Sequence, residues 1–357
     1  MPKTRKILND LKAIEFVGYN KVADNTFPNL VPLFSGYSVE EIEKFCWVDN
    51  NNVFDDCPWI WKYYNTFGYN TGYGEDACWM GVFNYLKNGF SQPPVDYYLR
   101  TYIKANEDEI GHSKLLNAKY CVGSRFATQV LFEYAYKFCS NFTLSNKKFW
   151  GFYWGSSLTH DYLNVVSDTD DIYEIFLENI QKDGILDNTV IFFMSDHGIR
   201  WGGIRETFQG RIEERLPFLY VLLPKWFRET YSSAVMNMLR NKHMLTTPFD
   251  VHETMKDLLD LDLLKQEVLI KRTKGLKDKR GISLFLPMPK ERTCESAGIT
   301  EEWCTCHQSK NISVVDEKVE RAAQTVVSHI NSMLFQYIQC AHLNLKEVSL
   351  KPFLFEA

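Results

Sequence analysis

The stretch Thr189-Val190-Ile191-Phe192-Phe193-Met194-Ser195-Asp196-His197-Gly198 joins a continuous apolar run to a polar cluster. An apolar run without alternation predicts a fully buried strand, of the kind found in a parallel sheet that helices cover on both faces. Ligands of open α/β sheets collect where such strands end. Asp196 and His197 stand at that end and offer an oxygen and a nitrogen ligand for a divalent metal. A turn with a capping Asp and a surface His is the alternative interpretation.

Further strands, and helices between them, are predicted on both sides of this stretch. Residues 149–154 and 218–223 are short apolar runs typical of buried strands. Residues 125–139 and 170–182 have the apolar spacing of helices, and Thr247-Pro248 introduces a further helix at 250–259. Strands that alternate with helices predict an α/β fold with a mostly parallel sheet flanked by helices.

Length and composition set the broad class of the protein. The chain has 357 residues, enough for two domains or for one large α/β domain with a small companion. A hydrophobic fraction of 45% excludes disorder over most of the chain. The net charge of −5 gives no basic surface for nucleic acid. No apolar run reaches the roughly 18 residues of a transmembrane segment.

Charge and cysteine distribution suggest the domain boundaries. Lysines and arginines dominate the chain after Lys265 as far as Arg280, which is typical of a solvated segment. We therefore predict a core at 1–264, an exposed basic linker at 265–285, and a small cysteine-bearing C-terminal unit at 286–357.

Nine cysteines and two glycosylation sequons, at Asn141 and Asn311, favour an extracellular or secretory-lumen glycoprotein with disulfide bonds. The pairing of the cysteines is not deducible from sequence. The segment 303–307, Trp-Cys-Thr-Cys-His, also suggests a metal knuckle, but a second Cys-x-x-Cys at zinc spacing is missing. The N-terminus is basic and has no apolar core, so it is no signal peptide. The odd cysteine number and the missing signal together predict that the natural N-terminus lies further upstream.

Two more polar clusters follow predicted strands. Thr26, in Asn25-Thr26-Phe27-Pro28-Asn29, has a hydroxyl at the head of a helix, where it can be a nucleophile or simply a helix cap. His160, in Thr159-His160-Asp161, can bind a metal or protonate a leaving oxygen, or it can be a loop histidine bonded to backbone. Asp24, Asp161 and the predicted polar loop 72–76 are candidates to line the same cleft.

Taken together, these segments resemble the alkaline phosphatase and sulfatase superfamily. Residues 184–198 resemble its G-x-x-D-N-T-h-h-h-h-x-S-D-H-G segment, and Glu213 to Phe218 resemble the sulfatase E-x-R-x-P segment. Thr26-Phe27-Pro28-Asn29 stands where sulfatases carry Cys-x-Pro-Ser-Arg. The resemblance runs over about residues 1–262. More narrowly, the chain resembles an uncharacterised sulfatase-like family of animals, a domain of unknown function.

The resemblance implies a role for each matching residue. Thr26 would be the nucleophile and a metal ligand, and Asp196 and His197 would be metal ligands. His160 would face the ester oxygens of the substrate, and Arg215 would be structural. The implied cofactor is a divalent metal (zinc, manganese or calcium), and the implied partner is a small-molecule, glycan or lipid ester.

Two departures from the superfamily pattern shape the functional hypothesis. Sulfatases need Cys or Ser for conversion to formylglycine, so Thr26 favours phosphate-ester chemistry. The superfamily also places a strand that ends in an acidic ligand upstream of the nucleophile, and Met1 comes too late to include it. We therefore expect a metal-dependent hydrolase or transferase that acts on a phosphate ester. The alternatives are an inactive sulfatase-like binding protein and a sulfatase that acts without formylglycine.

Overall fold

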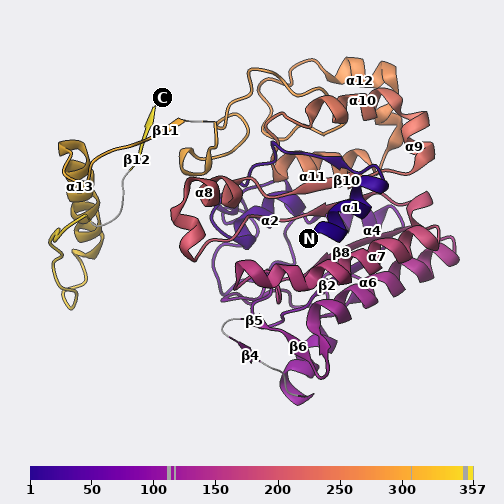
Figure 1. Ribbon diagram of the computed structural model, residues 1–357, viewed down its shortest axis with the longest axis horizontal. Coiled ribbons are helices and arrows are strands. Elements are labelled where there is room, and N and C mark those ends of the chain that lie inside the picture. The colour runs from indigo at the N-terminus through magenta and orange to yellow at the C-terminus, as the bar shows by residue number, and fades with distance from the viewer. Residues whose placement is uncertain (111–113, 116–117, 307, 349–352, 357) are drawn as a thin grey trace. The chain divides into compact units, whose positions relative to one another are not determined.

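The computed structural model describes residues 1–110, 114–115, 118–306, 308–348 and 353–356 (Figure 1). It divides into two compact units, Met1–Cys304 and Thr305–Ala357. The α-helices are, in chain order, α1 (Pro2–Asp10), α2 (Thr26–Ser35), α3 (Val39–Ile42), α4 (Ile60–Thr66), α5 (Arg100–Ala105), α6 (Ala127–Leu144), α7 (Asp170–Lys182), α8 (Phe208–Arg215), α9 (Lys225–Thr230), α10 (Ser232–Asn241), α11 (Pro248–Asp257), α12 (Gln266–Arg272) and α13 (Glu317–Leu334).

The strands form two three-stranded sheets and three two-stranded pairs. One sheet has the order β3-β2-β8, and both of its pairings are parallel. The other has the order β1-β10-β9, and both of its pairings are antiparallel. The strands are β1 (Ile14–Glu15), β2 (Asn70–Glu75), β3 (Tyr97–Tyr98), β4 (Lys114–Leu115), β5 (Ala118–Lys119), β6 (Cys121–Val122), β7 (Arg125–Phe126), β8 (Phe149–Trp154), β9 (Ile191–Met194), β10 (Leu219–Leu222), β11 (Gln308–Asn311) and β12 (Phe353–Glu356).

Strand β10 lies between two helix layers and is buried along its whole length. Successive side chains of a strand point to opposite faces. Tyr220 and Leu222 belong to a cluster with apolar side chains of α1 and α7, whereas Leu219 and Val221 belong to the cluster that contains α2 and α11. Helices thus cover both faces of this sheet, which explains the continuous apolar sequence of β10.

The parallel sheet is covered in the same way. Helix α6 packs against β8 and β2 on one face, and it also packs against α7, beside which it runs in Figure 1. A Cβ atom on Gly72 of β2 would come within 2.8 Å of the Phe138 ring of α6, so the helix approaches this sheet at a glycine. On the other face, Phe34 of α2 packs against Phe152 with their ring centroids 4.5 Å apart.

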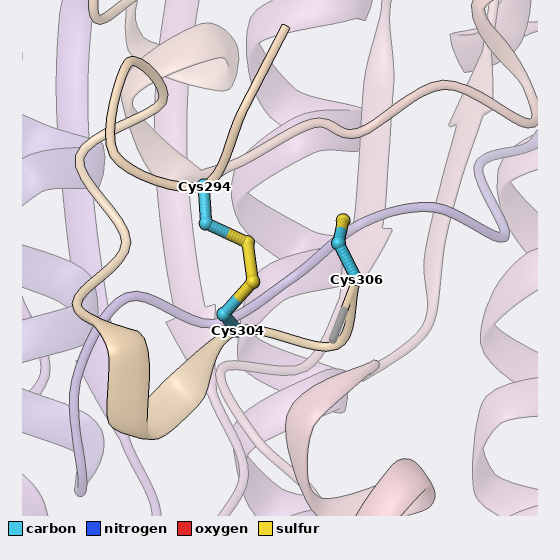
Figure 2. Close-up of side chains that lie close together, drawn as sticks. All are labelled: Cys294, Cys304 and Cys306. Atoms are coloured by element: carbon cyan, nitrogen blue, oxygen red, sulfur yellow. A yellow bond between two sulfur atoms is a disulfide. The ribbon is translucent and has the colours of Figure 1, made fainter. Parts of the chain in front are cut away.

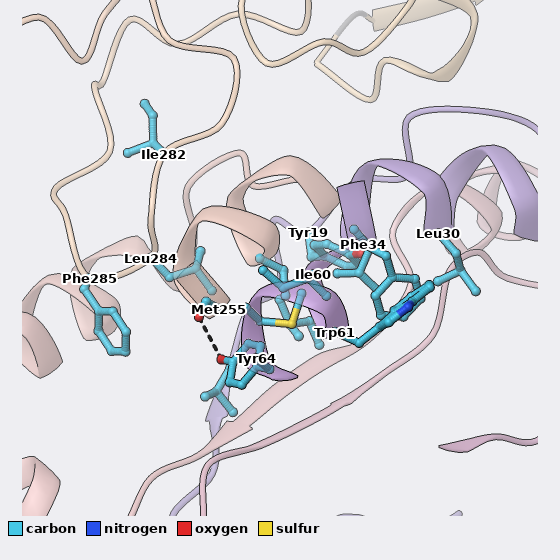
Figure 3. Close-up of a cluster of buried hydrophobic side chains, with 14 of the residues drawn as sticks. Tyr19, Leu30, Phe34, Ile60, Trp61, Tyr64, Met255, Ile282, Leu284 and Phe285 are labelled. Atoms are coloured by element: carbon cyan, nitrogen blue, oxygen red, sulfur yellow. Dashed lines mark hydrogen bonds between the residues drawn. The ribbon is translucent and has the colours of Figure 1, made fainter. Parts of the chain in front are cut away.

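The main hydrophobic core is rich in aromatic side chains, as Figure 3 shows for part of it. Trp61 stacks on Trp59 with ring centroids 5.2 Å apart. The hydroxyl of Tyr64 donates a hydrogen bond to the Met255 carbonyl oxygen at 2.7 Å, which satisfies a buried polar group. Ile282, Leu284 and Phe285 belong to the same core, as do 34 further buried side chains drawn largely from residues 14–95 and 219–288.

The predicted α/β class is confirmed, and several elements match their predicted ranges. Strand β8 (Phe149–Trp154) and helix α7 (Asp170–Lys182) have the predicted bounds. The prediction that Thr189–Met194 forms a fully buried strand is wrong in its burial, because every residue of β9 is only half-buried. The reason is its position: β9 is the edge strand of its sheet.

The division into units does not coincide with the predicted boundaries at 264 and 285. Leu269 and Leu276 are buried in the main core together with Phe285, so the basic segment keeps its lysines outside and its leucines inside. The compact unit continues to Cys304.

Two disulfide bonds join cysteines that are close in sequence. Cys46 is bonded to Cys57, and Cys294 is bonded to Cys304. Figure 2 shows the second bond, with Cys306 two residues further along the chain. Thiols joined in a disulfide are not thiolate ligands for zinc, so the metal-knuckle alternative for 303–307 loses one of its cysteines. His307 lies outside the described residues.

The second unit contains β11, β12 and the amphipathic helix α13. None of the residues of α13 is buried. None of the helices in the described part of the chain combines the length and the apolar character that crossing a bilayer requires.

Candidate functional site

The loop after β9 fixes the ring of His197 in one orientation. Its Nδ1 lies 2.8 Å from the Gly198 carbonyl oxygen, and the Ser195 hydroxyl donates to the His197 carbonyl oxygen at 2.8 Å. A carbonyl oxygen can only accept a hydrogen bond, so Nδ1 carries a proton, and in the neutral ring Nε2 keeps its lone pair. Metal-binding histidines are commonly oriented by such a bond at the second ring nitrogen.

Asp196 places a carboxylate beside that lone pair. One carboxylate oxygen, Oδ1, accepts the backbone N–H of His197 at 2.9 Å. The other, Oδ2, lies 3.3 Å from His197 Nε2, is buried and has no hydrogen-bond partner among the described residues. Two acceptor atoms that face each other repel unless a cation lies between them. Asp196 and His197 therefore suit a divalent metal, which would take a lone pair from each of the two facing atoms.

Thr26 reaches the same point from a distant part of the chain. It is the first residue of α2, and its Oγ1 lies 3.5 Å from His197 Nε2. The loop before it is held by the buried side chain of Asn29, whose amide oxygen accepts the backbone N–H groups of Val22 and Ala23 at 2.8 and 3.1 Å. The Asn29 amide nitrogen donates to the Ala23 and Asn25 carbonyl oxygens. The Thr26 hydroxyl is thus held toward His197.

A second set of contacts joins these two segments behind the site. Lys21 and Glu214 are almost completely buried, and their side chains form an ion pair at 2.9 Å. The Lys21 ammonium also donates to the Asp24 carbonyl oxygen at 3.2 Å, close to Thr26. Burial lowers the pKa of Lys21, and the bond to Glu214 acts against that shift. Lys21 and Glu214 were not predicted, because a lysine and a glutamate 193 positions apart carry no sequence signal.

Gly198 is required by the close approach of the chain that carries Glu214. A Cβ atom at Gly198 would lie 2.3 Å from the Glu213 carbonyl oxygen, and the Gly198 N–H donates to the Glu214 carbonyl oxygen at 3.0 Å. The Asp-His-Gly sequence therefore packs against the end of α8. This contact couples the position of His197 to that of the Lys21–Glu214 pair.

His160 follows β8 and has its own carboxylate partner. Its Nδ1 lies 2.9 Å from Oδ1 of Asp161, and a carboxylate can only accept, so Nδ1 carries the proton and Nε2 is free. Trp201 donates from Nε1 to the His160 carbonyl oxygen at 3.2 Å, and the two rings are 5.2 Å apart. No hydrogen bond among the described residues joins His160 to Thr26, Asp196 or His197.

The predicted polar loop 72–76 is mostly strand, since β2 extends to Glu75. Asp76 has a supporting role that was not anticipated. Its carboxylate accepts the backbone N–H of Ser156 at 2.7 Å and the hydroxyls of Ser157 and Thr128 at 2.7 and 2.6 Å. Burial raises the pKa of Asp76, and these bonds oppose the shift. Asp76 thus fixes the loop that leads to His160.

Asp24, a candidate to line the cleft, forms an ion pair with the Arg200 guanidinium at 2.9 Å, and its side chain is half-exposed. His252 is buried, and its Nδ1 lies 3.1 Å from the Leu33 carbonyl oxygen. Burial lowers the pKa of His252 to about 4.

One cavity of about 1040 Å³ is lined by these polar groups and by many apolar side chains. Thr26, His160, Asp196 and His197 all line it. Its volume is at the upper end of the range for small-molecule sites. The four residues singled out from the sequence therefore open into a common space, and His197 contacts both Thr26 and Asp196.

Among solved structures, this chain is similar to a lipoteichoic acid synthase, LtaP, from Listeria monocytogenes (12% identity, 62% of this chain and 60% of that chain, TM-score 0.43). It is also similar to the PsFucS1 sulfatase from Pseudoalteromonas sp. (13% identity, 87% and 69%, TM-score 0.46). A third is the Bacteroides thetaiotaomicron structure BT33494S-sulf (13% identity, 89% and 74%, TM-score 0.48). The chain thus spans about 60% of the length of LtaP.

No curated protein matches the chain. Residues 1–349 match the family described as "Protein of unknown function (DUF229)". This match confirms the predicted relationship to a domain of unknown function. The chain belongs to the DUF229 family.

Proposed function

We propose that this chain carries the catalytic site of a metal-dependent hydrolase or transferase that acts on a phosphate ester through Thr26. One observation carries the proposal: Thr26 Oγ1 lies 3.5 Å from His197 Nε2, beside the buried and unpartnered Oδ2 of Asp196. An oriented hydroxyl next to a nitrogen and an oxygen ligand is the arrangement of a metal-activated nucleophile.

Thr26, Asp196 and His197 would hold the divalent cation. Their donor set of hydroxyl, carboxylate and imidazole suits zinc and manganese, and its oxygens also suit calcium. When bound, the cation lowers the pKa of the threonine hydroxyl and neutralises charge on the phosphoryl oxygens.

In the first step, the Thr26 hydroxyl releases its proton to solvent and Oγ1 bonds to phosphorus. The bond from phosphorus to the alcohol oxygen breaks, and that oxygen takes a proton from Nε2 of protonated His160. Asp161 accepts a hydrogen bond from the opposite ring nitrogen of His160 and so fixes the orientation of the ring. In the second step, water attacks phosphorus and the bond from phosphorus to Thr26 Oγ1 breaks. Oγ1 takes one proton of that water, Nε2 of His160 takes the other, and the released phosphate takes up the proton that was given to solvent in the first step. An acceptor alcohol in place of water gives transfer.

The location proposed for the protein is extracellular or the lumen of the secretory pathway. The disulfides Cys46–Cys57 and Cys294–Cys304 suit an oxidising compartment. Asn141 of the first sequon is exposed, as an N-glycosylation site must be. We propose glycan or lipid esters, or small phosphate esters, as the substrate class, because polar groups and many apolar side chains line the same cavity.

The test compares Thr26→Ala with Thr26→Ser on p-nitrophenyl phosphate, with zinc, manganese or calcium added. The alanine variant should lose at least about 10³-fold in kcat, because the nucleophile is gone, while the serine variant keeps a hydroxyl and measurable turnover. Equal activity of wild type and the alanine variant would overturn the threonine mechanism.

The same assay separates the remaining functional hypotheses. No turnover in wild type together with retained metal binding would favour a binding protein that has lost catalysis. Faster hydrolysis of p-nitrophenyl sulfate than of the phosphate, still dependent on Thr26, would favour a sulfatase that works without formylglycine.

A further inference from the structure

Residues 294–304 form a loop, here called the disulfide loop, that the bond between Cys294 and Cys304 closes (Figure 2). Inside the loop, the Ile299 N–H donates to the Cys294 carbonyl oxygen at 2.9 Å. Both cysteines and Ile299 are buried in one small cluster that also contains Val22. The disulfide loop therefore packs against the chain just before Thr26.

Trp303, near the end of this loop, covers the buried ion pair behind the site. Its ring lies over the Lys21 ammonium, with Nζ 3.8 Å from the ring centroid. Its carbonyl oxygen accepts a hydrogen bond from the Asn20 side chain at 2.9 Å. The neighbouring Glu302 carbonyl oxygen accepts from the Arg215 guanidinium, from Nε at 3.3 Å and from Nη2 at 3.2 Å. The end of the loop is thus fixed on the two chain segments that the ion pair joins.

The contacts of Lys21 come from three sides of its ammonium, which has three N–H donors. It donates to Glu214 at 2.9 Å and to the Asp24 carbonyl oxygen at 3.2 Å. The face of the Trp303 ring carries negative charge density and attracts the cation from a third side. Because the Lys21 side chain is buried, loss of the ring would let the ammonium turn or admit water, and its bond to Asp24 would weaken.

The Asp24 carbonyl oxygen is the contact through which Lys21 acts on the nucleophile. Asn29 fixes the carbonyl oxygens of the residues on either side of Asp24, and the Lys21 ammonium fixes that of Asp24 itself. Together these bonds set the course of the chain into Thr26, two positions later. A shift of the ammonium would therefore move the Thr26 hydroxyl, whose Oγ1 lies 3.5 Å from His197 Nε2.

The alternative is that Trp303 only fills the small apolar cluster, because tryptophan is often largely buried for its apolar surface alone. Two cations lie over its ring, however: Lys21 at 3.8 Å and the Arg215 guanidinium carbon at 5.2 Å from the centroid. Both cations are partners of Glu214. The ring therefore contacts the charged groups as well as the apolar cluster.

We propose that Trp303, fixed by the disulfide loop, is a positioning residue for the Thr26 nucleophile and acts on it through the Lys21 ammonium. The indole face keeps the ammonium in place, and the disulfide keeps the indole in place. The expected effect on turnover rests on the proposed function, whereas the effect on the chain before Thr26 does not.

The first test compares Trp303→Leu with Trp303→Phe in the full chain by amide hydrogen exchange. Leucine is apolar but has no ring, whereas phenylalanine keeps a ring face for the ammonium. The probes are the hydrogen-bonded amides of Lys21, Val22 and Ala23, with rates taken relative to α7 amides to correct for overall stability. We expect exchange at least about tenfold faster in the leucine variant, and within about threefold of wild type in the phenylalanine variant.

Two further variants separate the ring from the rest of the loop. Cys294→Ser combined with Cys304→Ser opens the loop but leaves Trp303 in the chain, and we expect the same faster exchange as in the leucine variant. Ile299→Ala removes apolar contacts from the same cluster but leaves the ring and the disulfide. It should keep the exchange rates within about threefold of wild type.

Turnover of p-nitrophenyl phosphate gives the readout that depends on the proposed function. Trp303→Leu should lower kcat at least about tenfold and change KM by less than about twofold, since the ring lies behind the site and acts only on the nucleophile. Trp303→Phe should recover most of the loss in kcat. A wild type without turnover would contradict the proposed function, and the exchange rates would then decide the positioning role alone.

Three results would overturn the proposal. One is exchange of the Lys21, Val22 and Ala23 amides in Trp303→Leu that stays within about threefold of wild type. Another is equal acceleration in Trp303→Leu and in either Trp303→Phe or Ile299→Ala, which would leave Trp303 with a packing role only. The third is an active wild type whose kcat the leucine variant retains.

Discussion

Two buried carboxylates lie close to the site, and they differ in how many cationic side chains surround them. Glu214 is surrounded by cations, with Lys21 at 2.9 Å, Arg215 at 3.3 Å and Arg205 at 3.7 Å. Asp196 is also buried, but its Oδ2 has no hydrogen bond within the described part of the chain and lies 3.3 Å from His197 Nε2. A protein tolerates such an unsatisfied group mainly where function requires it. The comparison separates a carboxylate paired with cations from one that we propose binds a metal.

Replacing the unsatisfied carboxylate should have the largest effect on function. Asp196→Asn should weaken divalent-metal binding by at least about 100-fold and reduce any turnover in proportion, because an amide carries no charge to oppose the cation. The free energy of unfolding without metal should stay the same or rise, since an unsatisfied buried charge is removed. Calorimetric titration with metal and urea unfolding measure the two quantities. A large loss of stability with unchanged metal affinity would reverse the assignment.

Replacing the satisfied carboxylate should act mainly on stability. Glu214→Gln leaves the Lys21 ammonium buried without its counter-ion, so the free energy of unfolding should fall by about 3–5 kcal/mol. The double variant Lys21→Met with Glu214→Leu removes both charges and should recover most of that loss. Urea unfolding of both variants checks this. A loss below about 1 kcal/mol in the single variant would show that the pair is not what holds the two segments together.

A third buried titratable group gives a pH dependence. The pKa of His252 is lowered by burial to about 4, so between pH 6.5 and 4 the unfolded chain binds a proton that the folded chain does not. Stability from this group is complete above pH 6.5 and is lost as the pH falls, by up to about 1.4 kcal/mol per pH unit.

Glu75 acts in the opposite sense over part of that range. Burial raises its pKa to about 7, so its contribution to stability is lost as the pH rises. The difference between wild type and His252→Gln isolates the histidine, and the variant should show the weaker loss of stability on acidification. Identical pH profiles in urea unfolding would contradict the prediction.

The smallest effect is expected at the exposed ion pair. Asp24 and Arg200 are 2.9 Å apart, but the Asp24 side chain is half-exposed. Asp24→Asn should change the free energy of unfolding by no more than about 1 kcal/mol, since solvent and salt screen such pairs. An effect as large as that of Glu214→Gln would mean that exposure does not distinguish the two pairs.

The local pattern of apolar residues predicted helices and strands well where the spacing of one element type, helix or strand, dominates the segment. The apolar spacing of α7 and the aromatic run of β8 gave their bounds, because both elements bury a continuous apolar surface. Strand β1 is confined to Ile14–Glu15, since β10 pairs with only those two residues. Cysteine pairing was out of reach, because nine cysteines allow many combinations and only the fold brings Cys294 to Cys304.

The candidate site residues carry a signal in the sequence, whereas the contacts that support them do not. Asp196, His197, Thr26 and His160 stand out because each follows a strand or begins a helix with a side chain suited to chemistry. Asp76 belongs to the segment 72–76 that was expected to line the cleft, but no feature of the sequence indicated that it bonds to Ser156 and fixes the loop before His160.

The sequence alone determined the α/β class, the polar residues at the strand ends and the family relationship, because these depend on local periodicity and on residue chemistry. Only the tertiary structure decided that Thr26 meets His197 across 171 positions, that Lys21 pairs with Glu214, and that β8 and β9 line one cavity. Such contacts depend on how distant segments pack, and packing is set by the whole core rather than by any one stretch of the chain.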